Sequence, residues 1–120
     1  ARLTAKNGNA SDLAFEGFCL GFLESIAVWI RESRRKPELI SQSLLQVEKD
    51  RAIRCVKHLD QFEECLTSSL SLASIAVACA LDLAQRRLDF NEVEKYPKLS
   101  EWFHEITKRQ SFQMTEPLPI

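Results

Sequence analysis

The sequence predicts a single all-α domain, a bundle of helices around one buried central helix. Apolar residues recur at spacings of three and four in several long stretches, which is the pattern of amphipathic helices. The segment from Leu72 to Leu81 is instead apolar on every side, so as a helix it must be buried on every side. No stretch alternates apolar and polar residues over a useful length for a strand, and 120 residues suit one domain.

The central segment has a recognisable start and a size that excludes a membrane span. Hydroxyl residues precede it, and we expect Ser71 to be the N-cap that accepts a hydrogen bond from the first free backbone N–H groups. Its small Ala and Cys side chains let neighbouring helices approach closely. About 11 apolar residues are too few to cross a bilayer, which needs roughly 20. We therefore expect a core helix and no membrane partner.

Residues 1–11 lack an apolar stripe and are interpreted as a linker or lead-in, followed by one helical domain over residues 12–120. A long amphipathic helix is predicted from Asp12 to Arg35. Gly17 and Gly21 lie four residues apart in it, and we expect them to allow close packing against another helix. The apolar stripe of this helix consists of Phe15, Phe18, Phe22, Ile26 and Trp29, widened by Cys19, Leu23 and Ile30.

Basic residues crowd the end of this helix, where cations meet the negative pole of the helix dipole, and Pro37 then stops it. A solvated helix end is favoured over an anion site. A second helix begins with a cap at Ser41 or Ser43. Its predicted apolar side comprises Leu45, Ala52, Ile53, Cys55, Val56, Leu59, Phe62 and Leu66. Its predicted solvent-exposed side comprises Glu48, Lys49, Asp50, Arg54 and Lys57.

The helical pattern of the central segment breaks over residues 86–91, and a last helix begins near Tyr96, with Pro97 at its first position. The predicted buried stripe of the last helix is Leu99, Trp102, Phe103 and Ile106. Residues 111–120 contain two prolines and are expected to form no further regular structure.

Charge and cysteine content exclude several classes of function. The net charge is −1, with 10 basic and 8 acidic residues in the first half of the chain and 6 and 9 in the second, which is no nucleic-acid footprint. The cysteines are Cys19, Cys55, Cys65 and Cys79. They form no Cys-x-x-Cys pair, so we expect no metal site, and free thiols in apolar helical settings indicate a reduced, cytoplasmic compartment.

No catalytic constellation is visible in the sequence. His58 and His104 have no nucleophile beside them and are interpreted as surface or core-edge residues. No glycine-rich phosphate loop, metal cluster or carboxylate pair is present either. The residues alone therefore support only a soluble helical bundle with no catalytic residue of its own.

Three spaced stretches resemble the C-terminal domain of cytosolic glutathione transferases, especially the bacterial glutathione-transferase-like proteins. They are the long helix ending in an Arg-rich run to Pro37, the segment Leu72–Leu81, and the segment from Tyr96 to Pro117 with its Arg-x-Ser-Phe tail. Two departures stand out. Ser74 occupies the capping-box position where the family usually has Asp, although a hydroxyl can still reach back to the N-cap N–H. Leu20 stands where relatives often carry an acidic residue, with Glu24 one turn later.

The resemblance implies that two domains contribute different parts of the active site. In glutathione transferases the thiol-activating residue lies in an N-terminal thioredoxin-like domain, which this chain lacks, so the chain alone should be inactive and bind no cofactor. Glutathione would be a co-substrate of the whole protein, a homodimer. By analogy, one wall of the pocket for the hydrophobic electrophile would come from Phe22, Ser25, Ile26 and Trp29, although a plain core role suits these residues as well.

A free-standing interaction module without catalysis is the alternative, because helical domains of this family also serve as docking units. Sequence ahead of Ala1 would separate the two interpretations. A strand-helix-strand pattern with an X-Pro turn favours the enzyme, and an initiator Met at or just before Ala1 favours the module.

Overall fold

The computed structural model describes residues 10–67 and 71–108, and all regular structure in these ranges is helical. This confirms the predicted all-α class. The elements in chain order are α1 (Ala10–Ser33), the 3-10 helix η1 (Pro37–Leu39), α2 (Gln42–Gln61), α3 (Glu63–Thr67), α4 (Leu72–Leu88), the 3-10 helix η2 (Glu92–Lys95) and α5 (Pro97–Thr107). The predicted irregular tail over residues 111–120 lies outside the described residues, as does most of the predicted lead-in.

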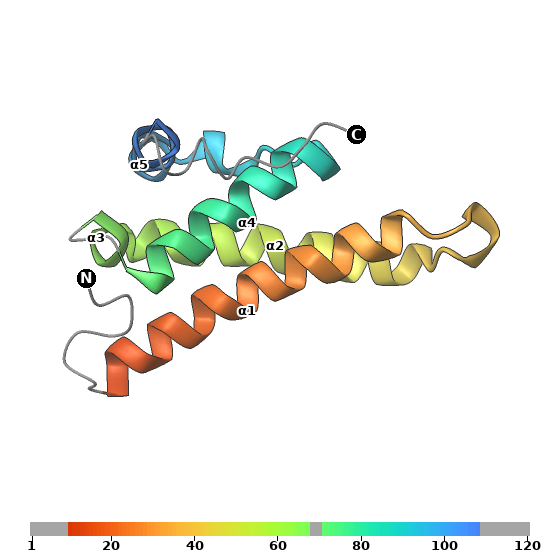
Figure 1. Ribbon diagram of the computed structural model, residues 1–120, viewed down its shortest axis with the longest axis horizontal. Helices are drawn as coiled ribbons and strands as arrows, with labels where there is room; N and C mark the ends of the chain where they lie inside the picture. Colours follow the sequence, from red (N-terminus) through yellow and green to blue (C-terminus); the bar gives the residue numbers. More distant parts are fainter. Residues whose placement is uncertain (1–9, 68–70, 109–120) are drawn as a thin grey trace.

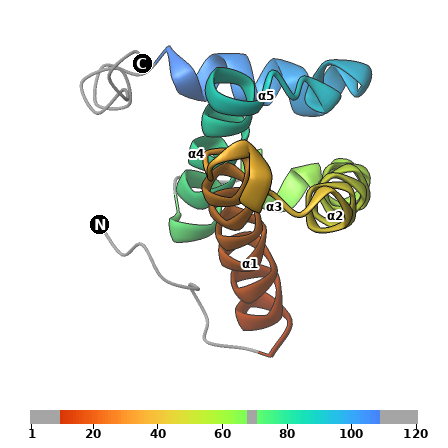
Figure 2. The ribbon, with the colours of Figure 1, turned by 90° about the vertical axis from the view of Figure 1, so that its right-hand side faces the viewer.

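Helices α1 and α2 form a long hairpin, and α4 lies against α1 (Figure 1). In the view turned by 90° (Figure 2), α2 lies on one side of α1, and α5 crosses the end of the bundle next to α4. The core lies between α1, α2, α4 and α5. Its largest fully buried side chains include Phe22 and Ile26 from α1, Leu81 from α4, and Leu99 and Phe103 from α5.

Helix α4 begins at the predicted cap. The Ser71 side chain accepts a hydrogen bond from the backbone N–H of Ser74 at 3.2 Å, and the backbone N–H of Ser71 donates to the Ser74 hydroxyl at 2.8 Å. These reciprocal bonds form a capping box in which the Ser74 hydroxyl replaces the usual carboxylate as the acceptor. The departure from the family pattern at this position therefore preserves the helix start.

Helix α4 is two turns longer than its apolar segment and is not buried on every side. It continues through Arg86 and Arg87 to Leu88, and it ends where Asp89 takes a left-handed φ of 52°. The Phe90 N–H then donates to the Ala84 carbonyl at 3.1 Å. The expected break over residues 86–91 thus begins only at Asp89, because basic residues in the last turn suit the helix dipole. The buried residues of α4 are Ala73, Ser74, Ala76, Val77, Ala78, Ala80, Leu81, Asp82 and Ala84.

The loop between α1 and α2 is held by a buried carboxylate that the sequence did not reveal. Glu32 is only 7% exposed and accepts a hydrogen bond from the Ser41 N–H at 2.8 Å. Arg35 donates to both oxygens of Glu32, at 3.3 and 3.2 Å. Because Ser41 is also the N-cap of α2, its side chain accepting from the Leu44 N–H, Glu32 connects the end of one helix to the start of the next.

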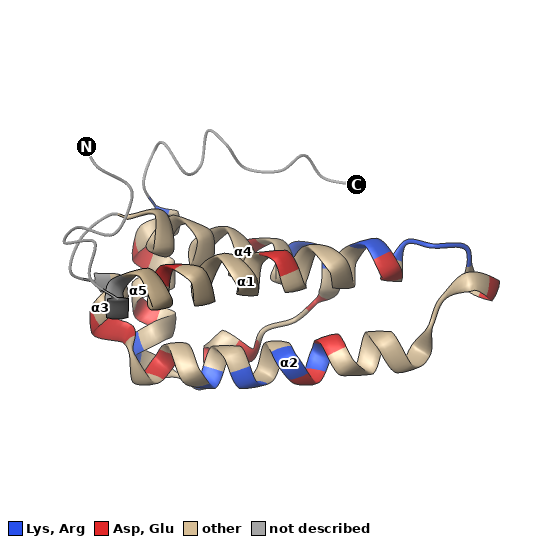
Figure 3. Ribbon diagram, turned by 90° about the horizontal axis from the view of Figure 1, so that it is seen from below, with Lys and Arg blue, Asp and Glu red and all other residues tan. Residues whose placement is uncertain are grey.

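The second predicted helix is interrupted, and Phe62 of its predicted apolar side is exposed. Helix α2 ends at Gln61, and Phe62, with φ of −118° and ψ of 28°, separates it from α3. Phe62 is 43% exposed, while Leu66 is buried from α3 instead. The charged side of α2 is confirmed for Lys49, Asp50, Arg54 and Lys57, which are exposed, and Figure 3 shows blue and red segments along α2.

The two glycines of α1 face open space, which overturns their predicted role in close packing within this chain. A Cβ atom built at Gly17 or Gly21 has no neighbour within 4 Å. Both lie on the exposed side of α1, near Leu20 and Glu24. Any close approach at this stripe would have to come from outside the described residues.

We expect Ala78→Leu to lower the free energy of unfolding by about 1–3 kcal/mol, because overpacking a filled core forces its neighbours to move. Ala78 is fully buried in α4. The matched control is Ala27→Leu at an exposed position of α1, which should be close to neutral. Ser74→Ala, which removes one half of the capping box, should cost about 1 kcal/mol. Urea melts of the three variants measure the ranking, and a neutral Ala78→Leu would contradict the packing of α4.

We expect Gly17→Ala and Gly21→Ala each to raise the free energy of unfolding of this chain by about 1 kcal/mol, because Ala is the better helix former and nothing opposes its Cβ. The reverse change at an exposed position of the same helix, Ala27→Gly, should lower it by a similar amount. Thermal and urea melts test this. A loss of stability in both alanine variants would mean that the stripe is already covered.

Candidate functional site

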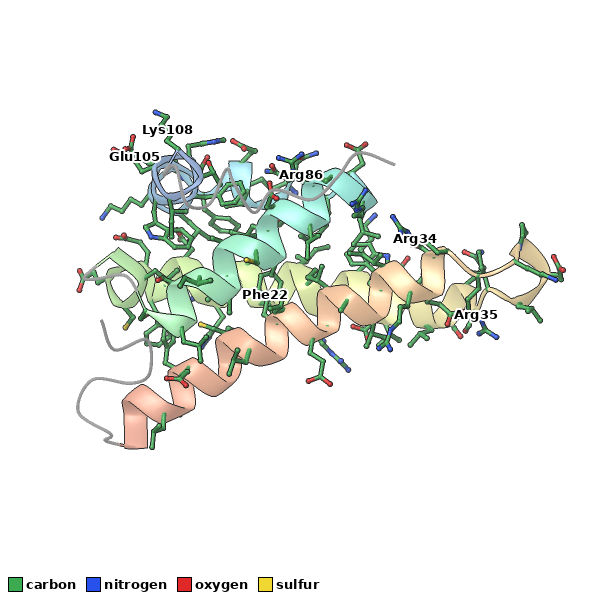
Figure 4. The ribbon with its side chains drawn as sticks, in the orientation of Figure 1. Phe22, Arg34, Arg35, Arg86, Glu105 and Lys108 are labelled. Atoms are coloured by element: carbon green, nitrogen blue, oxygen red, sulfur yellow. The ribbon has the colours of Figure 1, made fainter. Side chains whose placement is uncertain are left out.

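The four residues predicted to line an electrophile pocket lie together on one side of α1, and that side faces the core. Phe22 is 1% exposed, Ser25 6%, Ile26 0% and Trp29 8%. Figure 4 shows Phe22 between α1 and α4. Their shared face follows from helical spacing of three and four, but within this chain little of their surface is free for a ligand.

Ser25 is bonded to a buried carboxylate on the neighbouring helix. Its hydroxyl donates to Glu48 Oε2 at 2.5 Å, and Glu48 is only 4% exposed. Arg51, one turn further along α2, donates from Nη1 to Glu48 Oε1 at 3.3 Å. Glu48 was predicted on the solvent-exposed side of α2, and this prediction is wrong. The signal was available, because Glu48 lies three residues after Leu45 and four before Ala52, on their stripe.

Trp29 packs against a residue that follows α4. Its ring centroid lies 5.3 Å from that of Phe90, with an interplanar angle of 72°, an edge-to-face arrangement. Phe90 is itself 7% exposed, so the pair connects the end of α1 to the loop after α4. Phe90 was not among the residues predicted to be buried. The residues that hold the candidate wall in place are therefore Glu48 and Phe90.

A stripe of half-buried apolar side chains along α4 is the main open surface next to this wall. Its members are spaced by three and four, so they occupy one side of the helix: Leu72, Ile75, Cys79 and Leu83. On α1, the partly buried Leu23 and Ile30 pack at the edge of the core. Figures 1 and 2 show no described helix on the side of α1 and α4 opposite to α2. Among the described residues, helix α4 thus keeps one side without a covering helix.

The remaining side of α1 is exposed and also largely apolar. Leu13 is 52% and Leu20 39% exposed; the open Gly17 lies between them, and the open Gly21 directly follows Leu20. Glu24, the carboxylate one turn after Leu20, is exposed on this side. Its carboxylate is therefore accessible to a ligand or a second chain.

The four thiols are free, and burial raises the pKa of three of them. Burial raises the pKa of Cys19 to about 12, with the nearby Cys65, Cys55 and Glu16 side chains adding to the effect. Burial also raises the pKa of Cys55 and Cys79, against the opposing pull of Arg51 and Arg54 on Cys55. Cys65 is exposed, contrary to the expectation that every thiol would act as a small core hydrophobe.

The polar groups outside the core form no recognisable catalytic or metal centre among the described residues. No group of three or more His, Cys, Asp or Glu side chains there could hold a metal ion. His58 is exposed and packs between Phe18 and Phe62, with centroid distances of 4.6 and 4.8 Å. His104 is exposed and contacts Glu94 Oε1 at 3.1 Å. The interpretation of both as surface histidines is confirmed.

By length and composition, one helix in the described part of the chain could cross a membrane. The stretch Leu13–Ser33 of α1 has a mean hydropathy of 1.6. The core helix of a globular bundle passes the same test, and α1 packs on both α2 and α4. The composition of α1 is thus weak evidence for a membrane span.

Comparison with known proteins assigns this arrangement to a class. Residues 53–110 match the family model for the glutathione S-transferase C-terminal domain. No curated protein sequence matches the chain at a significant level.

Three solved structures of similar fold are glutathione transferases. A family member from Pseudomonas fluorescens Pf-5 with bound S-(propanoic acid)-glutathione matches 94% of this chain with a TM-score of 0.81 and 26% identity. The same match, with 26% identity and a TM-score of 0.81, is found for a Pseudomonas fluorescens Pf-5 family member with bound glutathione. A glutathione S-transferase from Methylobacillus flagellatus KT with glutathione bound matches 95% of the chain at 24% identity and a TM-score of 0.77, which supports the fold alone.

The fold is thus similar to the all-helical C-terminal domain of glutathione transferases, as the resemblance of three sequence stretches implied. Over residues 53–110 the chain is similar to the glutathione S-transferase C-terminal domain, and over most of its length it has the fold of the solved glutathione transferases. It spans 61%, 61% and 58% of the three solved chains, so roughly two fifths of each has no counterpart here.

We expect Ser25→Ala to lower the free energy of unfolding by about 1.5–3 kcal/mol, because it removes a hydrogen bond to a buried carboxylate. The matched control is Ser43→Ala, at an exposed serine of α2, which should be nearly neutral. Urea melts measure both. A Ser25→Ala variant as stable as the control would show that Glu48 finds another partner and that the pair does not hold α1 and α2 together.

Proposed function

We propose that this chain is the helical domain of an enzyme that conjugates glutathione to a hydrophobic electrophile, and that it supplies one wall of the electrophile pocket and part of a dimer surface. The observation that carries the proposal is the open apolar stripe of α4, formed by Leu72, Ile75, Cys79 and Leu83. A stripe of this kind next to a fully packed core is suited to a second, permanently associated domain.

The occupant that fits this surface is an N-terminal thioredoxin-like domain. The similar structures are longer than this chain, and their printed descriptions include bound glutathione or a glutathione derivative. Such a domain would provide the thiol-activating residue, for which the described residues offer no candidate. Glutathione is then a co-substrate held mainly by that domain, and this chain shapes the choice of electrophile.

The pocket wall remains assigned to Phe22, Ser25, Ile26 and Trp29 as a proposal. Their burial gives them a core role in this chain, and Trp29, at 8% exposed, has the most surface left for a substrate. The Ser25 hydroxyl is already hydrogen-bonded to Glu48, so the role of Ser25 in the wall would be to hold α1 in position.

A homodimer and a cytoplasmic location complete the proposal. The exposed side of α1, with Leu20 and the open Gly17 and Gly21, offers an apolar surface that a second subunit could approach closely. Glu24 on the same side would then face the partner subunit. Four free cysteines in a chain of this size suit a reducing compartment.

We expect the isolated chain to show no measurable binding of glutathione by calorimetric titration, because the groups that hold the tripeptide lie outside it. The full-length protein, titrated in the same buffer, should bind glutathione and conjugate it to an apolar electrophile. Binding by the isolated chain tighter than about 1 mM, some −4 kcal/mol, would place a complete site in the helical domain and overturn the two-domain account. A full-length protein that neither binds nor conjugates glutathione would remove the proposed activity.

We expect Trp29→Ala in the full-length protein to raise KM for bulky electrophiles while KM for glutathione stays nearly fixed, because contact area for the apolar substrate is lost. The substitution also removes the contact of Trp29 with Phe90, which should lower the free energy of unfolding. A loss of about 3–5 kcal/mol is expected if Trp29 is a core residue. Steady-state kinetics and melting on the same variant separate these effects.

Trp102→Ala is the matched control, since Trp102 is a half-buried tryptophan on α5, away from the proposed wall. It should reduce stability without changing electrophile preference. If the folded fraction of Trp29→Ala keeps the wild-type KM for both substrates, Trp29 belongs to the core and not to the pocket.

A further inference from the structure

We draw no further inference here: the strongest candidate, the thiol cluster of Cys19, Cys55 and Cys65 near the meeting of α1, α2 and α3, rests only on the raised pKa of Cys19, and burial that raises a thiol pKa disfavours the thiolate that redox or nucleophilic chemistry needs.

Discussion

The close packing of α4 against its neighbours is the constraint on which the rest of the structure depends. Its buried positions are mostly alanines, which add little volume, so most of the large side chains of the core come from other helices. Phe22 and Ile26 of α1 and Phe103 of α5 supply that volume, and burying each contributes about 1.5–3 kcal/mol. Small residues on one helix and large ones on its neighbours thus fix how near the helices lie.

Buried carboxylates then set the register of the helices. Glu48 joins α2 to Ser25 of α1, and Glu32 joins the end of α1 to the start of α2 at Ser41. Each carboxylate also forms an ion pair with an arginine three residues later in the chain, Glu32 with Arg35 and Glu48 with Arg51. A buried carboxylate without partners would cost several kcal/mol, and a slip of one helix past the other would separate these pairs. The polar contacts therefore make the hairpin specific, whereas the apolar core makes it stable.

The same packing leaves surfaces that favour a larger assembly. The half-buried stripe of α4 contains Ile75 and Cys79, and the exposed side of α1 carries Leu20 beside two glycines that face open space. Glycine in an exposed helix interior costs about 1 kcal/mol relative to alanine, and nothing within the described residues offsets that cost. A second domain on α4 and a second subunit on α1 are the occupants that the proposed enzyme would supply.

Local signals in the sequence determined the helical class, the cap at Ser71 and the start of α5 at Pro97, because each depends on residues only a few positions apart. They also placed Phe22, Ile26 and Trp29 on one side of α1. Tertiary structure alone decided that Glu48 bonds to Ser25, which lies 23 residues away, and it decided the break of α2 before Phe62 and the open surroundings of Gly17. These depend on which helix, if any, lies opposite each residue, and no local pattern contains that information.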